Sequence, residues 1–157
     1  MPIHIRRCLD CSFLLESFHG AIDLALLQSL MRWLAQEPSL DQCQYTLLDL
    51  REAELVLRAE TVRILAREHA RVLETRGRRR IALLVDCPLS TAFAMMWKQQ
   101  LPNHVSVPEV FCSLDGALSY LGARQDDFEA VARSAPLQTL DECTGEAASH
   151  PPVQAAG

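Results

Sequence analysis

The sequence lacks the long apolar run that a membrane-spanning helix requires. Apolar residues make up 49% of the 157 residues, but no stretch of them approaches the length of about 20 residues that crosses a bilayer. The first residues also lack the apolar core and the small-residue cleavage site of a signal peptide. We therefore expect a soluble, cytoplasmic chain with one main domain, which buries about 70% of the surface of its unfolded state.

Motifs that identify an enzyme are missing as well. The chain has no G-x-S-x-G turn around a nucleophilic serine and no glycine-rich phosphate-binding loop. Ser90 and Thr91 stand near the start of an expected helix, where free backbone amides can receive an anion. We expect no catalytic residue, no bound metal and no cofactor, and we take Ser90 and Thr91 as candidates for contact with a ligand or partner.

Cysteine is present, but its spacing does not identify a known site. Cys8 and Cys11 lie between two expected strands rather than at the start of a helix, and a zinc ion would need further ligands. In a cytoplasmic protein we expect the six cysteines to be reduced thiols, most of them buried. A redox or metal-binding role for Cys8 and Cys11 stays open.

Positive charge is concentrated in one part of an acidic chain. The net charge is −5, yet residues 58–80 contain eight arginines and three glutamates. Arg63, Arg67 and Arg71 recur every fourth residue and therefore share one side of an expected helix. This basic surface either contacts an anionic membrane or consists of arginines that pair with glutamates on the same helix. We do not expect nucleic acid as a partner, because no aromatic residue alternates with the arginines to stack on bases.

The most informative stretch is the uninterrupted apolar run at residues 81–85. Such a run is typical of a strand that is covered on both faces, as in the middle of a parallel sheet. The remaining patterns predict helices for both faces and a hairpin at the start of the chain, with Gly20 ending its second strand. Strands are expected at residues 2–7, 12–18, 45–50, 81–86 and 105–112, and helices at 22–36, 59–75, about 92–101, 113–122 and 124–133.

The expected element order is β-β-α-β-α-β-α-β-α. It predicts an α/β fold with a mixed, mostly parallel sheet of about five strands and helices packed on it. Pro108 suggests that the last strand lies at an edge of the sheet. Residues 1–123 form the expected domain, and residues 124–157 form a C-terminal extension with a short helix followed by disorder from residue 134.

The segment after the central strand carries more apolar residues than one helical face can use. Residues 92–97 are all apolar, and successive residues step by about 100° around a helix axis. Some of Phe93, Met95, Met96 and Trp97 therefore face away from the chain's own sheet, and Phe93, Met96 and Trp97 would form an exposed patch if they lie outside the core. We expect them to form a homodimer interface or to line a groove for an apolar ligand.

Together, these patterns resemble the STAS domain family (sulfate transporter and anti-sigma factor antagonist), in particular its small stand-alone bacterial members. The resemblance covers residues 3–123 and rests on the element order, on YTLLDLR at residues 45–51 and on VFCSLDGAL at residues 110–118. It implies a non-catalytic, regulatory module that binds a protein partner or a small apolar or anionic ligand. Anti-sigma factor antagonists of this family carry an Asp-Ser pair, with the phosphorylated serine, at the start of the helix after the central strand. Residues 52–60 contain no serine or threonine, so a switch by phosphorylation is not expected.

Two aspartates follow parallel strands at the sheet edge where α/β proteins bind ligands. Asp49 and Asp86 would hold a hard cation or share a proton if they lie close together; otherwise each accepts hydrogen bonds from backbone amides. Arg51 is placed to neutralise either one. His69 lies on the apolar stripe of its helix, so we expect a hydrogen-bonded core residue rather than a general base.

Three functional hypotheses follow from these residues. The preferred one is a cytoplasmic STAS-like binding module without catalysis. The second is a peripheral membrane or lipid-binding protein that uses residues 93–97 together with the arginines. The third is a small hydrolase or transferase that uses Asp49, Asp86 and Ser90.

Overall fold

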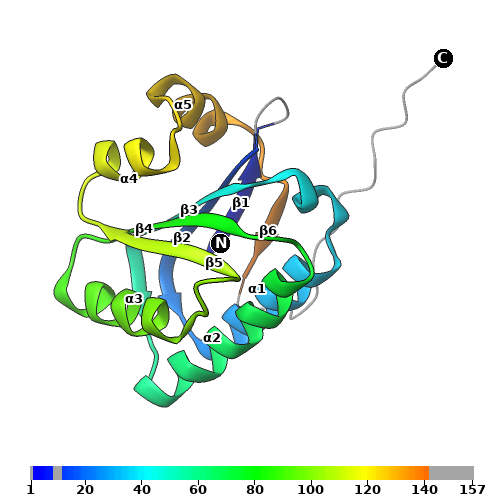
Figure 1. Ribbon diagram of the computed structural model, residues 1–157. Coiled ribbons are helices and arrows are strands. Elements are labelled where there is room, and N and C mark those ends of the chain that lie inside the picture. The colour runs from blue at the N-terminus through cyan, green and yellow to red at the C-terminus, as the bar shows by residue number, and fades with distance from the viewer. Residues whose placement is uncertain (1, 9–11, 142–157) are drawn as a thin grey trace.

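The protein has three layers, in which helices cover both faces of a single sheet. The computed structural model describes residues 2–8 and 12–141. Helices α1, α2 and α3 cover one face of the sheet, and α4 and α5 cover the other (Figure 1). The strands are β1 (Ile3–Arg7), β2 (Phe13–Ile22), β3 (Tyr45–Leu55), β4 (Arg79–Leu84), β5 (Ser106–Phe111) and β6 (Gln138–Leu140), and the helices are α1 (Leu24–Gln36), a 3-10 helix η1 (Pro38–Gln42), α2 (Ala59–Glu74), α3 (Pro88–Gln100), α4 (Leu114–Leu121) and α5 (Gln125–Arg133).

The strand order confirms the mixed, mostly parallel sheet. It runs β5-β4-β3-β2-β1-β6. The pairs β2/β3, β3/β4 and β4/β5 are parallel, whereas β1 is antiparallel to both β2 and β6. Strand β5 lies at an edge, as Pro108 predicted.

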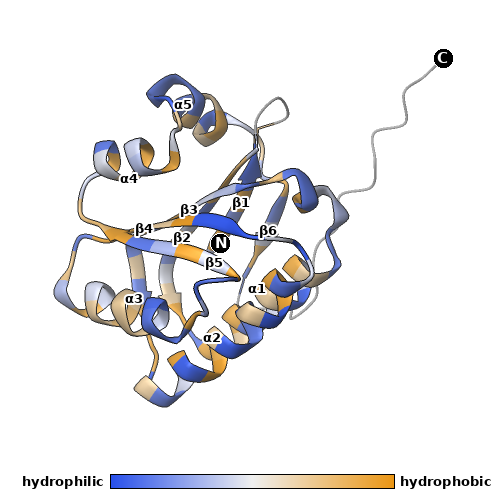
Figure 2. Cartoon of the chain, viewed as in Figure 1, coloured by the Kyte–Doolittle hydropathy of each residue, from blue (hydrophilic) through white to orange (hydrophobic). Residues whose placement is uncertain are grey.

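Alternation along β4 explains why both of its faces are covered. Ile81 and Leu83 pack under α1–α3, and Ala82 and Leu84 pack under α4 and α5. The strand begins at Arg79, two residues before the apolar run. Figure 2 shows this change from a hydrophilic start to an apolar remainder along β4. The expectation of a fully covered central strand is therefore confirmed.

Strands β2 and β3 are longer than the sequence predicted. Gly20 does not end β2: its φ of 66°, a left-handed value that glycine adopts without strain, lies within the strand. A register irregularity between Ser17 and His19 marks a β-bulge in the pairing with β3. Beyond it the two strands continue as a ribbon to Ile22 and Leu55, so the expected linker after residue 50 is a strand.

Capping residues mark the start of two helices, α1 and α4. The side chain of Asp23 accepts a hydrogen bond from the backbone N–H of Leu26 at the start of α1. Ser113 caps α4 in the same way, and Gly122 closes it in the left-handed conformation. Helix α3 begins earlier than expected, with Pro88 in its first turn, a position where the missing N–H of proline removes no hydrogen bond.

The C-terminal extension contributes a sixth strand to the sheet. After α5, which the sequence predicted, β6 pairs with β1 through the register Ile3↔Leu140. Gln138 and Leu140 are buried, so the expected disorder from residue 134 is wrong for this segment. Burial of these two side chains at the sheet edge stabilises a strand that residues 134–141 alone do not indicate. The remainder of the extension, residues 142–157, lies outside the described residues.

Candidate functional site

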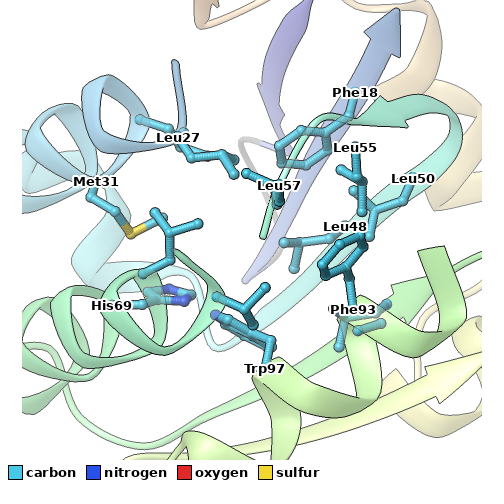
Figure 3. Close-up of a pocket in the computed structure, with 15 residues that line it drawn as sticks. Phe18, Leu27, Met31, Leu48, Leu50, Leu55, Leu57, His69, Phe93 and Trp97 are labelled. Atoms are coloured by element: carbon cyan, nitrogen blue, oxygen red, sulfur yellow. The ribbon is translucent and has the colours of Figure 1, made fainter. Parts of the chain in front are cut away.

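An apolar pocket lies among α1, α2, α3 and the extended part of β3. Its volume is about 80 Å³. Apart from His69, every described residue that lines it is apolar: Phe18, Leu27, Leu30, Met31, Leu48, Leu50, Leu55, Leu57, Val62, Leu65, Leu83, Phe93, Ala94 and Trp97. Figure 3 shows side chains from all three helices and from β3 directed toward the same space.

The lengthened β3 and the apolar surplus of α3 together produce this pocket. The continuation of β3 past the bulge brings Leu50 and Leu55 to the pocket wall. On α3, Phe93 and Trp97 are four residues apart and therefore project from the same side of the helix. Met96 is half-buried and does not line the pocket. The structure thus brings two of the three predicted contact residues of α3 together.

His69 forms the polar part of the pocket wall. Its side chain is 7% exposed, and its ring stacks on Trp97 with 5.1 Å between the ring centroids. Its Nδ1 atom is buried and has no hydrogen-bond partner among the described residues. Burial, with a smaller contribution from Arg79, lowers the pKa of His69 to about 4. His69 is therefore a neutral core residue, as expected, but the expected hydrogen bond is not formed within the described part of the chain.

A second, smaller cavity lies on the other side of His69. It has a volume of about 20 Å³, and Glu16, Thr46 and Arg79 contribute to its wall. Glu16 is 3% exposed, and its burial raises the pKa of the carboxyl group to about 7, although Arg79 acts in the opposite direction. Arg79 donates from Nη2 to the Leu40 carbonyl oxygen over 2.7 Å, while its buried Nε has no partner among the residues described. The face of the sheet under α1–α3 therefore holds two buried ionisable side chains, Glu16 and Arg79.

The first of the two aspartates predicted to follow parallel strands, Asp49, lies within β3, which runs on to Leu55, and is held by an arginine. Arg51 binds Asp49 through two hydrogen bonds, from Nε over 2.9 Å and from Nη2 over 2.7 Å. This hydrogen bonding to Asp49 is the largest cause of a raised pKa of Arg51, to which the nearby charge of Asp86 also contributes. No group of three metal-binding side chains occurs within residues 2–8 and 12–141. Arg51 thus neutralises Asp49, the role proposed for it from the sequence.

Ser90 and Thr91 are engaged in the first turn of α3. The Cys87 thiol donates to Ser90 Oγ over 3.2 Å, and Thr91 Oγ1 donates to the Cys87 carbonyl oxygen over 2.8 Å. Ser90 is 2% exposed. Hydrogen bonding to Ser90, first through its side chain and then through its backbone, lowers the pKa of the Cys87 thiol. Both hydroxyl groups are therefore hydrogen-bonded within the first turn of α3.

A polar groove opens on the opposite face of the sheet, beside α5. It is lined by His4, Arg6, Leu15, Ser17, His19, Asp49, Phe128 and Ala132. The rings of His4 and His19 are 5.2 Å apart, and His19 Nδ1 lies 2.8 Å from Glu52 Oε2. Burial, followed by the charges of Arg6 and His19, lowers the pKa of His4. Arg6 and Asp49 are also hydrogen-bonded to neighbours, so these two charged groups of the groove already have partners.

The basic surface of α2 faces solvent. Arg63, Arg67 and Arg71 are exposed, and none of them forms an ion pair among the described residues. The alternative in which these arginines pair with glutamates of the same helix is thus not seen. Within the same part of the chain, no helix has the length and apolar character needed to cross a membrane.

The described cysteines differ in oxidation state. Cys8 is disulfide-bonded, so the prediction of a reduced thiol is wrong at this position. Cys11 lies outside the described residues. Cys43, Cys87 and Cys112 are free thiols, as expected, and Cys43 is buried in the core under α1 and α2.

Comparisons with known proteins find similarity to solved structures. No family model matches the chain, and no curated protein matches it. The chain is similar to an uncharacterized protein of the DUF3478 family from Shewanella loihica PV-4, whose structure is described as having a SpoIIAA-like fold. The two share 20% sequence identity, the match covers 76% of this chain and 91% of the other, and the TM-score is 0.49. The similarity concerns the fold alone.

Sequence reasoning missed Glu16 and Arg79, which lie behind His69. Glu16 falls between Leu14 and Phe18 on one side of β2, and both of these neighbours are buried under α1–α3. Side chains alternate between the two faces of a strand, so the carboxyl group of Glu16 falls on the face that the helices cover. This alternation is the signal that could have identified Glu16. Arg79 is the middle residue of three consecutive arginines, and only the position at which β4 begins shows that it points inward.

Proposed function

We propose that the protein is a non-catalytic binding module that takes up a small apolar ligand in the pocket among α1, α2 and α3. The observation that carries this proposal is a pocket of about 80 Å³ whose wall is apolar apart from His69. Ligand sites are typically concave and apolar, with a few polar groups that fix orientation. A regulatory role fits the position of the pocket, because a ligand there touches three separate helices at once.

The volume of the pocket favours a small molecule over a protein segment. A cavity of about 150 Å³ lined by apolar side chains binds benzene, so about 80 Å³ suits a molecule smaller than benzene, such as a short branched alkane. A partner helix would need a row of pockets for several anchoring side chains. The occupant that fits is therefore a compact apolar ligand, and a protein partner or a second copy of the chain is an outcome for experiment to test.

The engagement of the candidate catalytic groups supports a role without catalysis. Asp49 is bound by Arg51, and Ser90 is buried and hydrogen-bonded to Cys87. A nucleophile needs an accessible oxygen and a base within reach. The titratable group in the pocket wall, His69, has a pKa of about 4, which is far below the range of an effective general base at neutral pH.

Titration with dissolved xenon, a small apolar probe that binds in apolar cavities, tests the proposal directly. We expect chemical-shift changes in amide spectra at residues of the pocket wall, and a higher melting temperature because the ligand binds the folded state. Ala94→Leu places a larger side chain in the pocket and should abolish both effects. Met95→Leu is the matched control on the same helix, because Met95 is exposed and outside the pocket. Equal binding by wild type and Ala94→Leu would contradict the proposal, as would a dimer in sedimentation whose interface covers the pocket.

Contact with an anionic membrane is a second candidate function. It is supported by the three exposed arginines of α2 without ion pairs among the described residues and by the exposed apolar side chain of Ile64 beside them. Flotation with vesicles of phosphatidylserine and phosphatidylcholine tests it: binding should fall when salt screens the charges and when Arg63, Arg67 and Arg71 are replaced by glutamine. Absence of binding at low salt would exclude it.

A further inference from the structure

A basic groove lies at the start of the parallel strands, on the face of the sheet that α4 and α5 cover. Its volume is about 640 Å³, and its wall includes Tyr45, Arg78, Arg80, Val107 and Tyr120. This volume falls within the range of about 300–1,000 Å³ that is typical of sites for small molecules. The groove lies on the opposite face of the sheet from the apolar pocket, so a ligand there is independent of the proposed function.

Strand pairing brings three of these residues into one row. Tyr45 of β3 is paired with Arg80 of β4, and Arg80 is paired in turn with Val107 of β5. Paired residues of neighbouring strands project from the same face of a sheet, and Tyr45 packs against the core under α4 and α5. Tyr120 of α4 lies next to this row, because its hydroxyl group donates to the Val107 carbonyl oxygen over 2.6 Å. The sheet therefore forms one side of the groove and α4 forms another.

The groove carries positive charge that no carboxylate neutralises among the described residues. Arg78 and Arg80 are exposed, and neither forms an ion pair within residues 2–8 and 12–141. The hydrogen bond from Arg80 Nη1 to the Tyr120 carbonyl oxygen is long, at 3.5 Å. A guanidinium group has five N–H donors, so Arg80 keeps donors for a ligand.

The pKa of Tyr120 indicates that both arginines act on the space beside α4. Burial, followed by the charge of Glu109, raises the pKa of Tyr120, whereas Arg80 and Arg78 act in the opposite direction. Glu109 is itself bound by Lys98, whose Nζ donates to Oε2 over 2.7 Å. The arginines therefore favour negative charge next to Tyr120, and the carboxylate that opposes them already has a partner.

The wall combines groups that bind an anion with groups that bind a flat ring. Arginine forms strong, charge-assisted hydrogen bonds with phosphate, and a concave surface that carries one sign of charge concentrates ligands of the opposite sign. Tyr45 offers an aromatic ring beside Arg80, and aromatic rings pack favourably on one another. Val107 adds an apolar contact in the same row.

We propose that this groove binds a small aryl phosphate, with its phosphate group at Arg78 and Arg80 and its aromatic ring against Tyr45 and Val107. The two arginines supply the attraction for the anion, and the row of Tyr45 and Val107 selects a flat, apolar body. This ligand is anionic and planar, so it differs in chemistry from the small apolar occupant proposed for the pocket under α1–α3.

Phenyl phosphate, inorganic phosphate and benzyl alcohol separate the two parts of the ligand. Their dissociation constants are measured by amide-spectrum titration at about pH 8, where a phosphate monoester carries close to two negative charges. Phenyl phosphate should bind about tenfold more tightly than either of the other two, because it alone makes both the ionic and the aromatic contacts. Its affinity should fall as added salt screens the arginines.

Substitution of the arginines tests whether the groove is where phenyl phosphate binds. Arg78→Gln combined with Arg80→Gln should weaken binding by about tenfold or more, the effect of losing charge-assisted hydrogen bonds. Arg63→Gln combined with Arg67→Gln is the matched control, because it removes the same charge from exposed positions on α2. This control should change the affinity by less than about twofold, since solvent and salt screen charges that lie far from the ligand. Tyr45→Leu should weaken phenyl phosphate more than inorganic phosphate.

The outcomes separate this inference from the proposed function. Unchanged binding of phenyl phosphate without Arg78 and Arg80 would overturn the inference, as would an equal loss in the control variant, which would show a response to net charge alone. Equal affinities for inorganic phosphate and phenyl phosphate would refute the aromatic contact. A glycine-flanked phosphotyrosine peptide that binds more tightly than phenyl phosphate would overturn the assignment to a free small molecule. None of these results bears on xenon binding in the apolar pocket.

Discussion

The face of the sheet under α4 and α5 contrasts with the face under α1, α2 and α3. Under α4 the contacts are close: Ala82 and Ala117 are both fully buried, and a Cβ atom at Gly116 would lie 3.3 Å from Phe111 Cδ1. Under α1–α3, the apolar pocket and the buried pair Glu16 and Arg79 interrupt the packing. The contrast indicates that the face under α4 and α5 is closely packed, whereas the larger core under α1–α3 leaves the space that we propose for a ligand.

Truncation of a leucine on each face gives the largest expected difference. Leu121 on α4 is 1% exposed, so Leu121→Ala should lower the free energy of unfolding by about 2–5 kcal/mol through lost burial and a new cavity. Leu27 lines the pocket on α1 and is half-buried, so Leu27→Ala should cost only about 1 kcal/mol. Urea unfolding of both variants measures this. Equal losses would show that the two faces are packed alike.

The pH dependence of stability tests the charged interior of the α1–α3 face. Burial raises the pKa of Glu16 from 4.5 to about 7, so its contribution to stability is complete below pH 4.5 and is lost as the pH rises toward about 7. Burial lowers the pKa of His69 from 6.5 to about 4, so its contribution is complete above pH 6.5 and is lost as the pH falls toward about 4. Between these limits the two residues oppose each other, by about 1.4 kcal/mol per pH unit each.

Single substitutions separate these opposing contributions. Relative to wild type, Glu16→Gln should gain up to about 3 kcal/mol as the pH rises from 4.5 to 7, and His69→Phe should gain a similar amount as the pH falls from 6.5 to 4. Urea unfolding across this range measures both, with the exposed Glu74→Gln as control. A variant whose profile runs parallel to that of wild type would show that its residue has an ordinary pKa in the folded protein.

Enlargement of a buried alanine on each face is the next smaller test. Ala94 lines the pocket and Ala117 lies in the close contact of α4 with the sheet. Ala117→Leu should lose about 1–3 kcal/mol through overpacking, whereas the added side chain of Ala94→Leu enters existing space and should leave stability within about 1 kcal/mol of wild type. Thermal unfolding of the two variants compares them. A large loss for Ala94→Leu would mean that the pocket is already filled by neighbouring side chains.

The smallest effect is expected at the ion pair between Arg51 and Asp49 on β3. The side chains of Arg51 and Asp49 are 41% and 16% exposed, and ion pairs that solvent screens contribute less than about 1 kcal/mol. Asp49→Asn should therefore change stability by no more than this amount. Measurement of unfolding at low and high salt checks the expectation. A loss of unfolding free energy comparable to that of Leu121→Ala would show that this ion pair contributes as much as a buried leucine. Such a result would weaken the contrast between the two faces.

Hydrophobic periodicity was sufficient to predict the element order and the sheet. The apolar run at residues 81–85 and the spaced apolar residues of α1, α2 and α4 are local signals, and local signals are what a sequence displays. The extra length of β2 and β3 was not predicted, because beyond residue 50 each strand is stabilised by pairing with the other and not by the local preferences of its own residues. Strand β6 was missed for the same reason: three residues become a strand only because β1 offers an open edge.

The candidate site was predictable only in part. Six consecutive apolar residues on α3 predicted that some of Phe93, Met95, Met96 and Trp97 face away from the sheet. Met95 is the exposed one, whereas Phe93 and Trp97 line the pocket between the helices and the sheet, so the prediction was wrong for these two residues. The role of His69 depends on what surrounds its ring in three dimensions, and no spacing in the sequence shows that its nitrogen lacks a partner among the described residues. The burial of Glu16 could be predicted only with knowledge of which side of β2 lies under α1–α3.

The pairing of Ile3 with Leu140 places the first and last described strands next to each other at one side of the sheet. Residues 2 and 141 consequently emerge side by side, and a short linker would join them into a closed ring. Opening that ring at an exposed connection, such as the one containing Gly77, would give a circularly permuted chain with the same sheet. Both faces of the sheet could then be studied with the chain ends moved away from β1 and β6.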